Sequence, residues 1–434
     1  MGAAVTAEDA LDLSLAAAEA PHRLALVSTT ERLTYAELSA RVARRARTLR
    51  APVSIAPTLD VDTMVTLLAA VAARAPLVLL HPRGTAEDHA TRRALIERAT
   101  LPPDTLALLF TSGTTGVPKV ALLPRTSVAA ALGASAERLG WQPEDRWGLL
   151  LPPAHIGGLS VLLRCVQGRA TTVLGASPFD APAAIDQVER ERITLLSVVP
   201  TMLAHLLDAG WRPPAHLRAV LVGGAALPPE LHRRALAAGV PVHATYGMTE
   251  TCAQMATAAP DEPGVGRPLP GVQLRIDEGQ IRVRGPSLFA GYLGRPSPFD
   301  ADGFFPTGDA GYLDDAGYLH VTGRLDDRIV TGGENVDPAV VEAALEAHPA
   351  LVEAAVFGAP DPVWGQVVSA FVVSSLPDDA LRETVAQVAA NLAAHERPRR
   401  VLRVDAVPRT PSGKKQRRAD AADGRLLSLE AEPR

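Results

Sequence analysis

The sequence predicts an α/β fold: a large N-terminal domain of layered α/β sheets with a small β subdomain, followed by a small α+β C-terminal domain. Its 434 residues exceed what one compact core accommodates. Apolar strand candidates alternate with helical segments through the first half, which favours layered sheets with largely parallel strands. Beyond Pro270, short strand candidates separated by Gly, Asp and Pro replace this alternation.

The composition favours a protein that binds a small molecule. The 43 basic and 48 acidic residues give a net charge of −5, so neither a nucleic acid nor an acidic membrane is expected as a partner. Cys165 and Cys252 are too far apart in sequence to indicate a disulfide framework or a cysteine metal site. Residues 1–20 lack the pattern of a secretory signal. We therefore expect a cytoplasmic protein.

The N-terminal elements are predicted from caps and periodicity. Thr34 and Glu37 have capping-box spacing, which indicates a helix to about Arg50. The further elements expected here are a helix Asp62 to Ala73, strands Leu77 to Leu80 and Leu106 to Phe110, a helix Ser127 to Leu139, a strand Gly148 to Leu151, and helix and strand pairs through Val188 to Val199 and Leu217 to Val222.

The second half carries the β subdomain and a smaller unit. Residues 280–284 alternate polar and apolar side chains, and strand candidates continue to Thr322. The polar stretch 323–327 predicts the main domain boundary. After it, Asp337 and Pro338 indicate a helix start. We expect strands at Leu351 to Phe357 and Val367 to Val373, a helix at Leu381 to Ala394, and a loose tail after Arg418.

A loop rich in hydroxyls and glycines follows the strand that ends at Phe110. Its glycines permit close approach, and hydroxyls, free N–H groups and a lysine can gather around an anionic oxygen. The loop is not a Walker A motif, because Pro118 stands where that pattern needs its second glycine. In isolation it could equally be a solvated turn. The predicted phosphate ligands are Thr111, Ser112, Gly113, Thr114, Thr115, Gly116 and Lys119.

Five further segments stand out. Residues 152–159, 223–228 and 246–250 each follow a strand candidate, and the carboxyl ends of strands are where open α/β sheets bind ligands. The others are Thr307-Gly308-Asp309 and Pro411-Ser412-Gly413-Lys414-Lys415. Together with the first loop, these segments in this order resemble the adenylate-forming superfamily of acyl-CoA synthetases, carrier-loading adenylation domains and luciferases. The resemblance implies two steps: a carboxylate attacks the α-phosphorus of ATP and expels pyrophosphate, then a thiol takes the acyl group.

The same resemblance implies the nucleotide ligands. Asp309 would accept hydrogen bonds from the ribose hydroxyls, which an ionised carboxylate can do with two oxygens. Glu250 would bind Mg²⁺, a hard cation that favours carboxylate and phosphate oxygens. Without the resemblance, these would be an ordinary loop aspartate and a solvated glutamate. Also implied are Gly223, Gly224 and Ala225 at the adenine, Tyr246 and Gly247 among the nucleotide-binding residues, Thr249 at the α-phosphate, and Arg324 at the ribose or phosphate.

The C-terminal residues would act in turn. Lys414 would stabilise the charge that builds as pyrophosphate leaves, with Lys415 as a possible substitute. The resemblance places a hinge at Asp326, between domains 1–325 and 327–434. Rotation about it would withdraw the lysine before the thiol enters. The predicted lining of the coenzyme A tunnel is Gly332, Gly333 and Glu334.

His155 favours acid–CoA ligases over amino-acid-activating domains, which usually place an Asp in this region. Local runs such as residues 155–160 and 246–254 are most similar to the o-succinylbenzoate–CoA ligase branch of menaquinone biosynthesis. Other aryl or acyl acids, carrier-protein loading, a nucleotide-binding protein without catalysis, and a homodimer all stay open. The candidate acid-pocket residues are His155, which is also a candidate catalytic residue, Ser160, Thr251 and Gln254.

Overall fold

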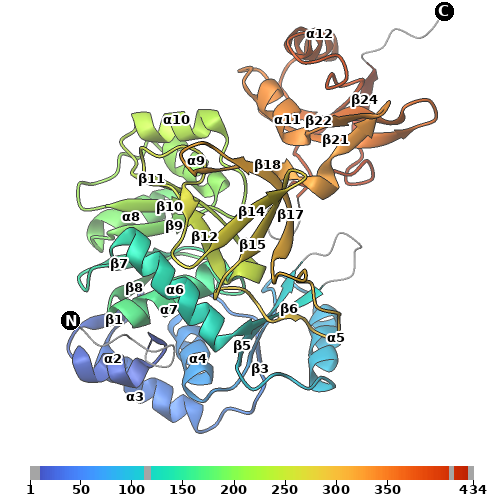
Figure 1. Ribbon diagram of the computed structural model, residues 1–434. Helices are drawn as coiled ribbons and strands as arrows, with labels where there is room; N and C mark the ends of the chain where they lie inside the picture. The colour runs from blue at the N-terminus through green and yellow to red at the C-terminus, as the bar shows by residue number, and fades with distance from the viewer. Residues whose placement is uncertain (1–9, 112–118, 410–414, 429–434) are drawn as a thin grey trace, which may run out of the picture.

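The computed structural model describes residues 10–111, 119–409 and 415–428. These residues form a mixed α/β architecture built on four sheets (Figure 1). The largest sheet is mainly parallel, as predicted, and runs in the order β13-β12-β11-β10-β9-β7-β8-β1-β2. Its strands are β1 (Leu24–Val27), β2 (Arg32–Thr34), β7 (Arg146–Leu149), β8 (Thr171–Leu174), β9 (Leu195–Val198), β10 (Ala219–Val222), β11 (Val242–Met248), β12 (Ala253–Thr257) and β13 (Arg267–Pro268).

A second sheet runs in the order β16-β6-β5-β4-β3 and carries the two flanks of the predicted phosphate loop. β5 ends at Thr111 and β6 begins at Lys119, and these two residues are antiparallel partners. The described residues therefore present both ends of the loop at one edge of this sheet. Its strands are β3 (Val53–Ile55), β4 (Leu77–Leu79), β5 (Thr105–Thr111), β6 (Lys119–Pro124) and β16 (Gly291–Tyr292).

Two helices lie between these sheets. α6 (Arg125–Leu139) contacts β5 and β6 on one side and β12 on the other, and α7 (Ile156–Gly168) packs on β7, β8 and β12. α7 is buried along most of its length, as expected for a helix with neighbours on several sides. The remaining helices of this part are α2 (Leu13–Glu19), α3 (Tyr35–Ala46), α4 (Val61–Ala72), α5 (Ala86–Glu97), α8 (Ala181–Arg190), α9 (Pro200–Asp208) and α10 (Pro229–Ala237).

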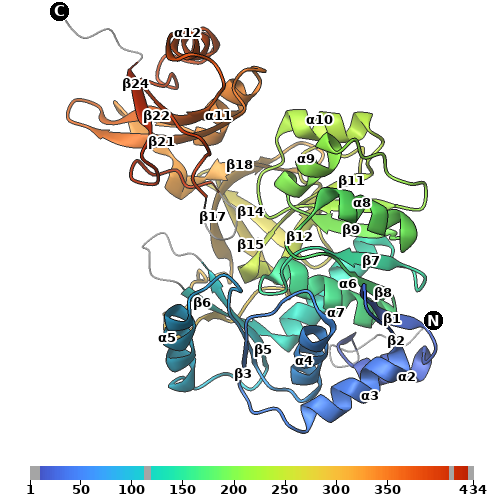
Figure 2. The same cartoon turned by 180° about the vertical axis from the view of Figure 1, so that it is seen from behind.

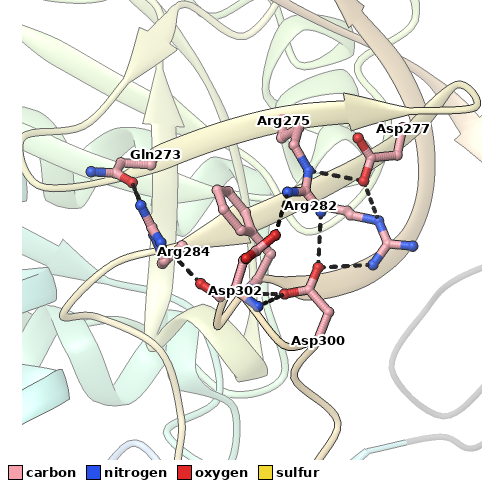
Figure 3. A network of polar contacts seen from close by, with 8 residues as sticks. Gln273, Arg275, Asp277, Arg282, Arg284, Asp300 and Asp302 are labelled. Carbon is pink, nitrogen blue, oxygen red and sulfur yellow. Dashed lines mark hydrogen bonds and ion pairs between the residues drawn. The ribbon is translucent and has the colours of Figure 1, made fainter.

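The predicted β subdomain is a sheet in the order β14-β15-β17-β18. A network of arginines and aspartates fastens its first hairpin to the turn before β17 (Figure 3). Asp300 accepts hydrogen bonds from Arg275, Arg282 and the backbone of Phe304, and the Arg275 guanidinium lies 4.5 Å from the centre of the Phe304 ring. The network thereby fixes the start of β17. The strands are β14 (Gln273–Asp277), β15 (Gln280–Arg284), β17 (Phe305–Leu313) and β18 (Leu319–Arg324).

The described residues of the ranges 329–409 and 415–428 form a further sheet with apolar clusters of their own. Figures 1 and 2 show it apart from the body of the molecule, beside β17 and β18. The short helix η2 (Leu325–Asp327) precedes it. Its elements are β19 (Ile329–Thr331), β20 (Glu334–Val336), α11 (Pro338–Glu346), β21 (Glu353–Asp361), β22 (Gly365–Val373), α12 (Asp378–Ala389), β23 (Arg400–Arg403) and β24 (Arg425–Ser428).

The structure confirms the predicted caps and corrects two expectations. Thr34 and Glu37 form the capping box, and Asp337 caps α11. The tail after Arg418 is not loose throughout, because Arg425–Ser428 pairs with β23, and Leu427 is buried in the C-terminal core. Residues 246–248 do not follow a strand but lie within β11, because the antiparallel partner β12 extends that strand beyond its parallel neighbour β10. None of the described helices combines the length and the hydrophobicity that a transmembrane span requires.

Replacing Asp300 with Ala should lower the midpoint of thermal unfolding at pH 7 by roughly 2–4 °C, measured by circular dichroism. Hydrogen bonds from Phe304 and Asp302, with the charges of Arg275 and Arg282, lower the pKa of Asp300 despite the opposing effect of desolvation. A lowered folded-state pKa contributes stability above the unfolded value of about 3.9, and this contribution is lost as pH falls through the folded value. The difference from wild type should therefore shrink in acid.

The exposed Asp315, on the turn after β17, offers a matched Asp315→Ala control. Equal midpoints for wild type and Asp300→Ala at pH 7 would contradict the role of the network.

Candidate functional site

The predicted ribose ligand, Asp309, lies at the centre of a hydrogen-bonded cluster. Its Oδ2 accepts from the Tyr246 hydroxyl at 2.6 Å, and its Oδ1 accepts from Arg324 Nη1 at 3.0 Å. These residues come from β17, β11 and β18. Burial, followed by the negative charge of Asp309, raises the pKa of Tyr246, so the phenol stays protonated and acts as a donor. The cluster brings together three predicted nucleotide ligands from two sheets.

Glycines allow the backbone to close around this cluster. A Cβ on Gly247 would lie 1.8 Å from the carbonyl oxygen of Ala253, so no other residue fits there without moving the chain. Gly308 has a φ of +74°, and a Cβ on it would lie 3.1 Å from Arg324 Nη2. Gly223, Gly224 and Ala225 follow β10, beside β11, and Gly224 and Ala225 are exposed. They therefore lie just beyond the end of the strand that neighbours β11, and their contact with the adenine stays a prediction.

The predicted magnesium ligand, Glu250, lies in the short helix η1 (Thr249–Thr251) directly after β11. Its Oε1 accepts from the Tyr292 hydroxyl at 2.7 Å. Among the described residues no hydrogen bond is formed to Oε2, which fits a carboxylate that can offer one oxygen to a cation. These residues contain no cluster of three or more metal-ligating side chains. A lone carboxylate suits Mg²⁺, which proteins usually bind through one or two carboxylates together with substrate phosphates.

Tyr292 also contacts the flank of the phosphate loop. The Lys119 ammonium lies 5.1 Å from the centre of the Tyr292 ring. Lys119 pairs with Thr111, so the described ends of the predicted phosphate loop lie close to Glu250. Thr249, the predicted α-phosphate donor, precedes Glu250 and is partly exposed. A continuous set of contacts thus connects the second sheet with β11.

His155 lies at the N-terminus of α7, directly after the segment that follows β7. Its ring centre is 5.4 Å from that of His81, which follows β4 in the second sheet. Burial, with nearby arginine charges, lowers the pKa of His81, which favours the neutral ring at pH 7. The predicted acid-pocket residue therefore lies where the two large sheets approach one another.

The other acid-pocket candidates are buried and hydrogen-bonded within the protein. The Ser160 hydroxyl donates to Gly157 O, and the Thr251 hydroxyl donates to backbone carbonyls next to it. Gln254 Oε1 accepts from Ser135 and, at 2.7 Å, from Arg164. The structure therefore gives Ser160 and Thr251 supporting contacts, and their direct contact with an acid stays a prediction.

Arg164 is a residue that the sequence analysis did not single out. It is 4% exposed, its Nε has no hydrogen-bond partner among the described residues, and no carboxylate contributes to its pKa shift. Its guanidinium also lies 5.2 Å from the centre of the Trp147 ring. Burial lowers the pKa of Arg164 to about 10, so the group is still charged at pH 7. A single arginine within the apolar helix 159–166, four residues after Ser160, was the signal that could have identified it.

Several predicted residues lie outside the described ranges or away from this cluster. Residues 112–118, with Ser112, Gly113, Thr114, Thr115 and Gly116, and residues 410–414, with Lys414, are outside them. Lys415 is described: its Nζ donates to Glu346 and to Ala354 O, both at 2.7 Å. Gly332 and Gly333 form the turn between β19 and β20, and Glu334 begins β20; all three are exposed. Asp326 lies in η2 and contacts Arg324 at 3.4 Å.

Comparison with protein families gives two matches. The AMP-binding enzyme model matches residues 93–293, and the model of the AMP-binding enzyme C-terminal domain matches residues 340–414. The 2-succinylbenzoate–CoA ligase of Bacillus licheniformis is 37% identical over 333 residues, which cover 72% of this chain and 69% of that protein. The chain belongs to the adenylate-forming family of AMP-binding enzymes. Within this family it is of the 2-succinylbenzoate–CoA ligase type, as the enzyme of Bacillus subtilis, 37% identical over 343 residues (74% of this chain and 70% of that protein), also indicates.

Solved structures support the same placement of this adenylate-forming enzyme. The o-succinylbenzoate CoA synthetase of Bacillus subtilis in complex with its acyl-adenylate intermediate superposes with a TM-score of 0.84 at 31% identity, covering 95% of this chain and 99% of that one. The same enzyme in complex with ATP and magnesium gives a TM-score of 0.80 at 30% identity, covering 93% of this chain and 97% of that one. The predicted fold class is thereby confirmed.

Tyr246→Phe should weaken ATP binding roughly 10-fold, because hydrogen bonds to charged groups contribute about 1.5–3 kcal/mol and Asp309 would lose one that orients it. Isothermal titration calorimetry with ATP measures the change. The exposed Tyr312 in β17, replaced by Phe, is the control and should bind as wild type does. Unchanged affinity in Tyr246→Phe would show that its hydroxyl does not help Asp309 bind the nucleotide.

Proposed function

We propose that this adenylate-forming enzyme is an ATP- and Mg²⁺-dependent acid–CoA ligase that converts o-succinylbenzoate to its CoA thioester. The relatives that carry this activity in their names support the assignment. The observation that carries the choice of acid is Arg164, a buried guanidinium without an ion-pair partner among the described residues. A buried cation without a counter-charge is costly, and an anionic substrate group supplies one. o-Succinylbenzoate has two carboxylates, so one can be activated while the other meets the arginine.

The described residues suit the first step. Asp309 would hold the ribose hydroxyls, Thr249 would donate to the α-phosphate, and Glu250 would help bind Mg²⁺, which when bound would neutralise charge on the phosphates. A substrate carboxylate oxygen attacks the α-phosphorus, and the bond to pyrophosphate breaks. The product of this step is an acyl-adenylate, and His155 borders the acyl part of the site.

In the second step, the bond between the acyl carbon and the AMP oxygen is replaced by a bond to the sulfur of CoA. The CoA thiol loses its proton to solvent, its sulfur bonds to the acyl carbon, and AMP leaves. We assign Lys414 to the first step and Gly332, Gly333 and Glu334 to the thiol tunnel, with residues 327–434 rotating about Asp326 between the steps. Lys415 is a poor substitute for Lys414, because its ammonium is already engaged by Glu346 and Ala354.

A panel of acids tests the proposed function. With ATP, Mg²⁺ and CoA, and without a carrier protein, o-succinylbenzoate should give thioester and pyrophosphate with a kcat/KM well above that of benzoate or medium-chain fatty acids. Chromatography of the thioester and a coupled pyrophosphate assay measure the products. Another acid ranking first would replace the proposed substrate, and pyrophosphate release without thioester would favour carrier loading.

Arg164→Met should lower kcat/KM for o-succinylbenzoate at least about 30-fold, since removing one partner of a buried charge pair costs 2–5 kcal/mol or more. Monoacid analogues with only one of the two carboxylates provide the comparison. For any such analogue that the enzyme still converts to an acyl-adenylate, the loss of kcat/KM should be much smaller, because the carboxylate that meets Arg164 is already absent. Arg164→Lys keeps the charge and should retain part of the discrimination. Equal losses for the diacid and the monoacids, or an altered KM for ATP, would argue that Arg164 only supports the fold.

A further inference from the structure

Tyr292 contacts both sides of the predicted metal and phosphate site. It is the second residue of β16, which adds to the edge of β6 with Tyr292 paired to Ala121. Its hydroxyl donates to Glu250 Oε1 at 2.7 Å, and its ring faces the Lys119 ammonium at 5.1 Å. One side chain therefore touches the residue that ends the phosphate loop and the carboxylate assigned to Mg²⁺.

The position of Tyr292 is fixed by its surroundings. The Phe289 ring packs edge-on against it, with centres 4.9 Å apart. The Phe289 N–H donates to the carbonyl oxygen of Glu250 at 2.9 Å, so the segment that carries Tyr292 is also bonded to the backbone of Glu250. Burial, followed by the charge of Glu250, raises the pKa of Tyr292, so the hydroxyl remains a donor across the physiological range.

We infer that Tyr292 is a positioning residue that orients Glu250 for Mg²⁺ and sets the distance between that carboxylate and Lys119. By occupying Oε1 it fixes the plane of the carboxylate and leaves Oε2 for the cation. Hydrogen bonds to a metal ligand commonly change metal affinity 10- to 100-fold. The ring attracts the ammonium through its π face, which holds Lys119 in place without neutralising its charge. The inference rests on the proposed function, which assigns Mg²⁺ to Glu250 and phosphate to Lys119.

Two substitutions separate the two contacts of the tyrosine. Tyr292→Phe removes the hydroxyl and keeps the ring, whereas Tyr292→Leu removes both. Calorimetric titration of ATP, with Mg²⁺ or with EDTA, distinguishes their effects. For Tyr292→Phe we expect about a 10-fold loss of affinity with Mg²⁺ and wild-type affinity in EDTA. For Tyr292→Leu we expect an added loss in EDTA, because Lys119 loses its ring contact.

Tyr318 provides a matched control pair. The Arg267 guanidinium lies 4.8 Å from the centre of the Tyr318 ring. This cation–π contact resembles that of Lys119 with Tyr292 but involves neither Glu250 nor Lys119. Tyr318→Phe and Tyr318→Leu should bind ATP as wild type does under both conditions. In a Glu250→Gln background, Tyr292→Phe should cause no further loss, because the oriented carboxylate is gone.

Equal affinities of wild type and Tyr292→Phe with Mg²⁺ would overturn the inference and leave the proposed function standing. A Tyr292→Phe loss of the same size in EDTA would also overturn it, since the tyrosine would then only support the fold. Failure of the wild-type enzyme to bind ATP under either condition would overturn the proposed function itself, and the inference with it.

Discussion

The site depends on one carboxylate with two internal donors. Asp309 is 7% exposed, and a buried carboxylate is tolerated only when hydrogen bonds or charges compensate for its lost hydration. Tyr246 and Arg324 supply that compensation from two other strands. These hydrogen bonds connect the end of the large sheet and the β subdomain at Asp309, next to the segment that leads to the C-terminal sheet. Residues more than sixty positions apart are thereby placed within reach of one ligand.

Much of the fold was predictable because local chemistry determined it. The capping box at Thr34 and the cap at Asp337 define helix starts without any tertiary contact. The strand at Arg425–Ser428 was not predicted, because only its partner β23 gives these four residues a sheet to join. The extension of β11 through residues 246–248 likewise depends on β12. Short strands whose hydrogen bonds come from distant partners leave little local signal.

The candidate site shows the same division. Glu250, Asp309 and His155 were found from motifs, because their neighbours in sequence are distinctive. Arg164 and Tyr292 were missed, since neither lies in a recognisable motif. Their roles depend on hydrogen-bond partners about ninety and forty positions away in the sequence, respectively. Buried polar contacts between sheets are therefore what the structure adds to the motifs. In this protein they lie where α7 and β16 meet the strands that carry those motifs.

The residues just after position 414 are anchored in the C-terminal sheet. Arg417 donates two hydrogen bonds to buried Glu342 in α11 and a third, at 2.8 Å, to Asp327, while Lys415 is bonded to Glu346. To slide this segment alone would break several charge-assisted bonds at once, each about twice as strong as a neutral one. Any displacement that brings this segment to a distant ligand must consequently move α11 and its sheet with it as one rigid body. The rate of such a movement is then the rate at which the whole C-terminal unit moves, and not that of one flexible segment.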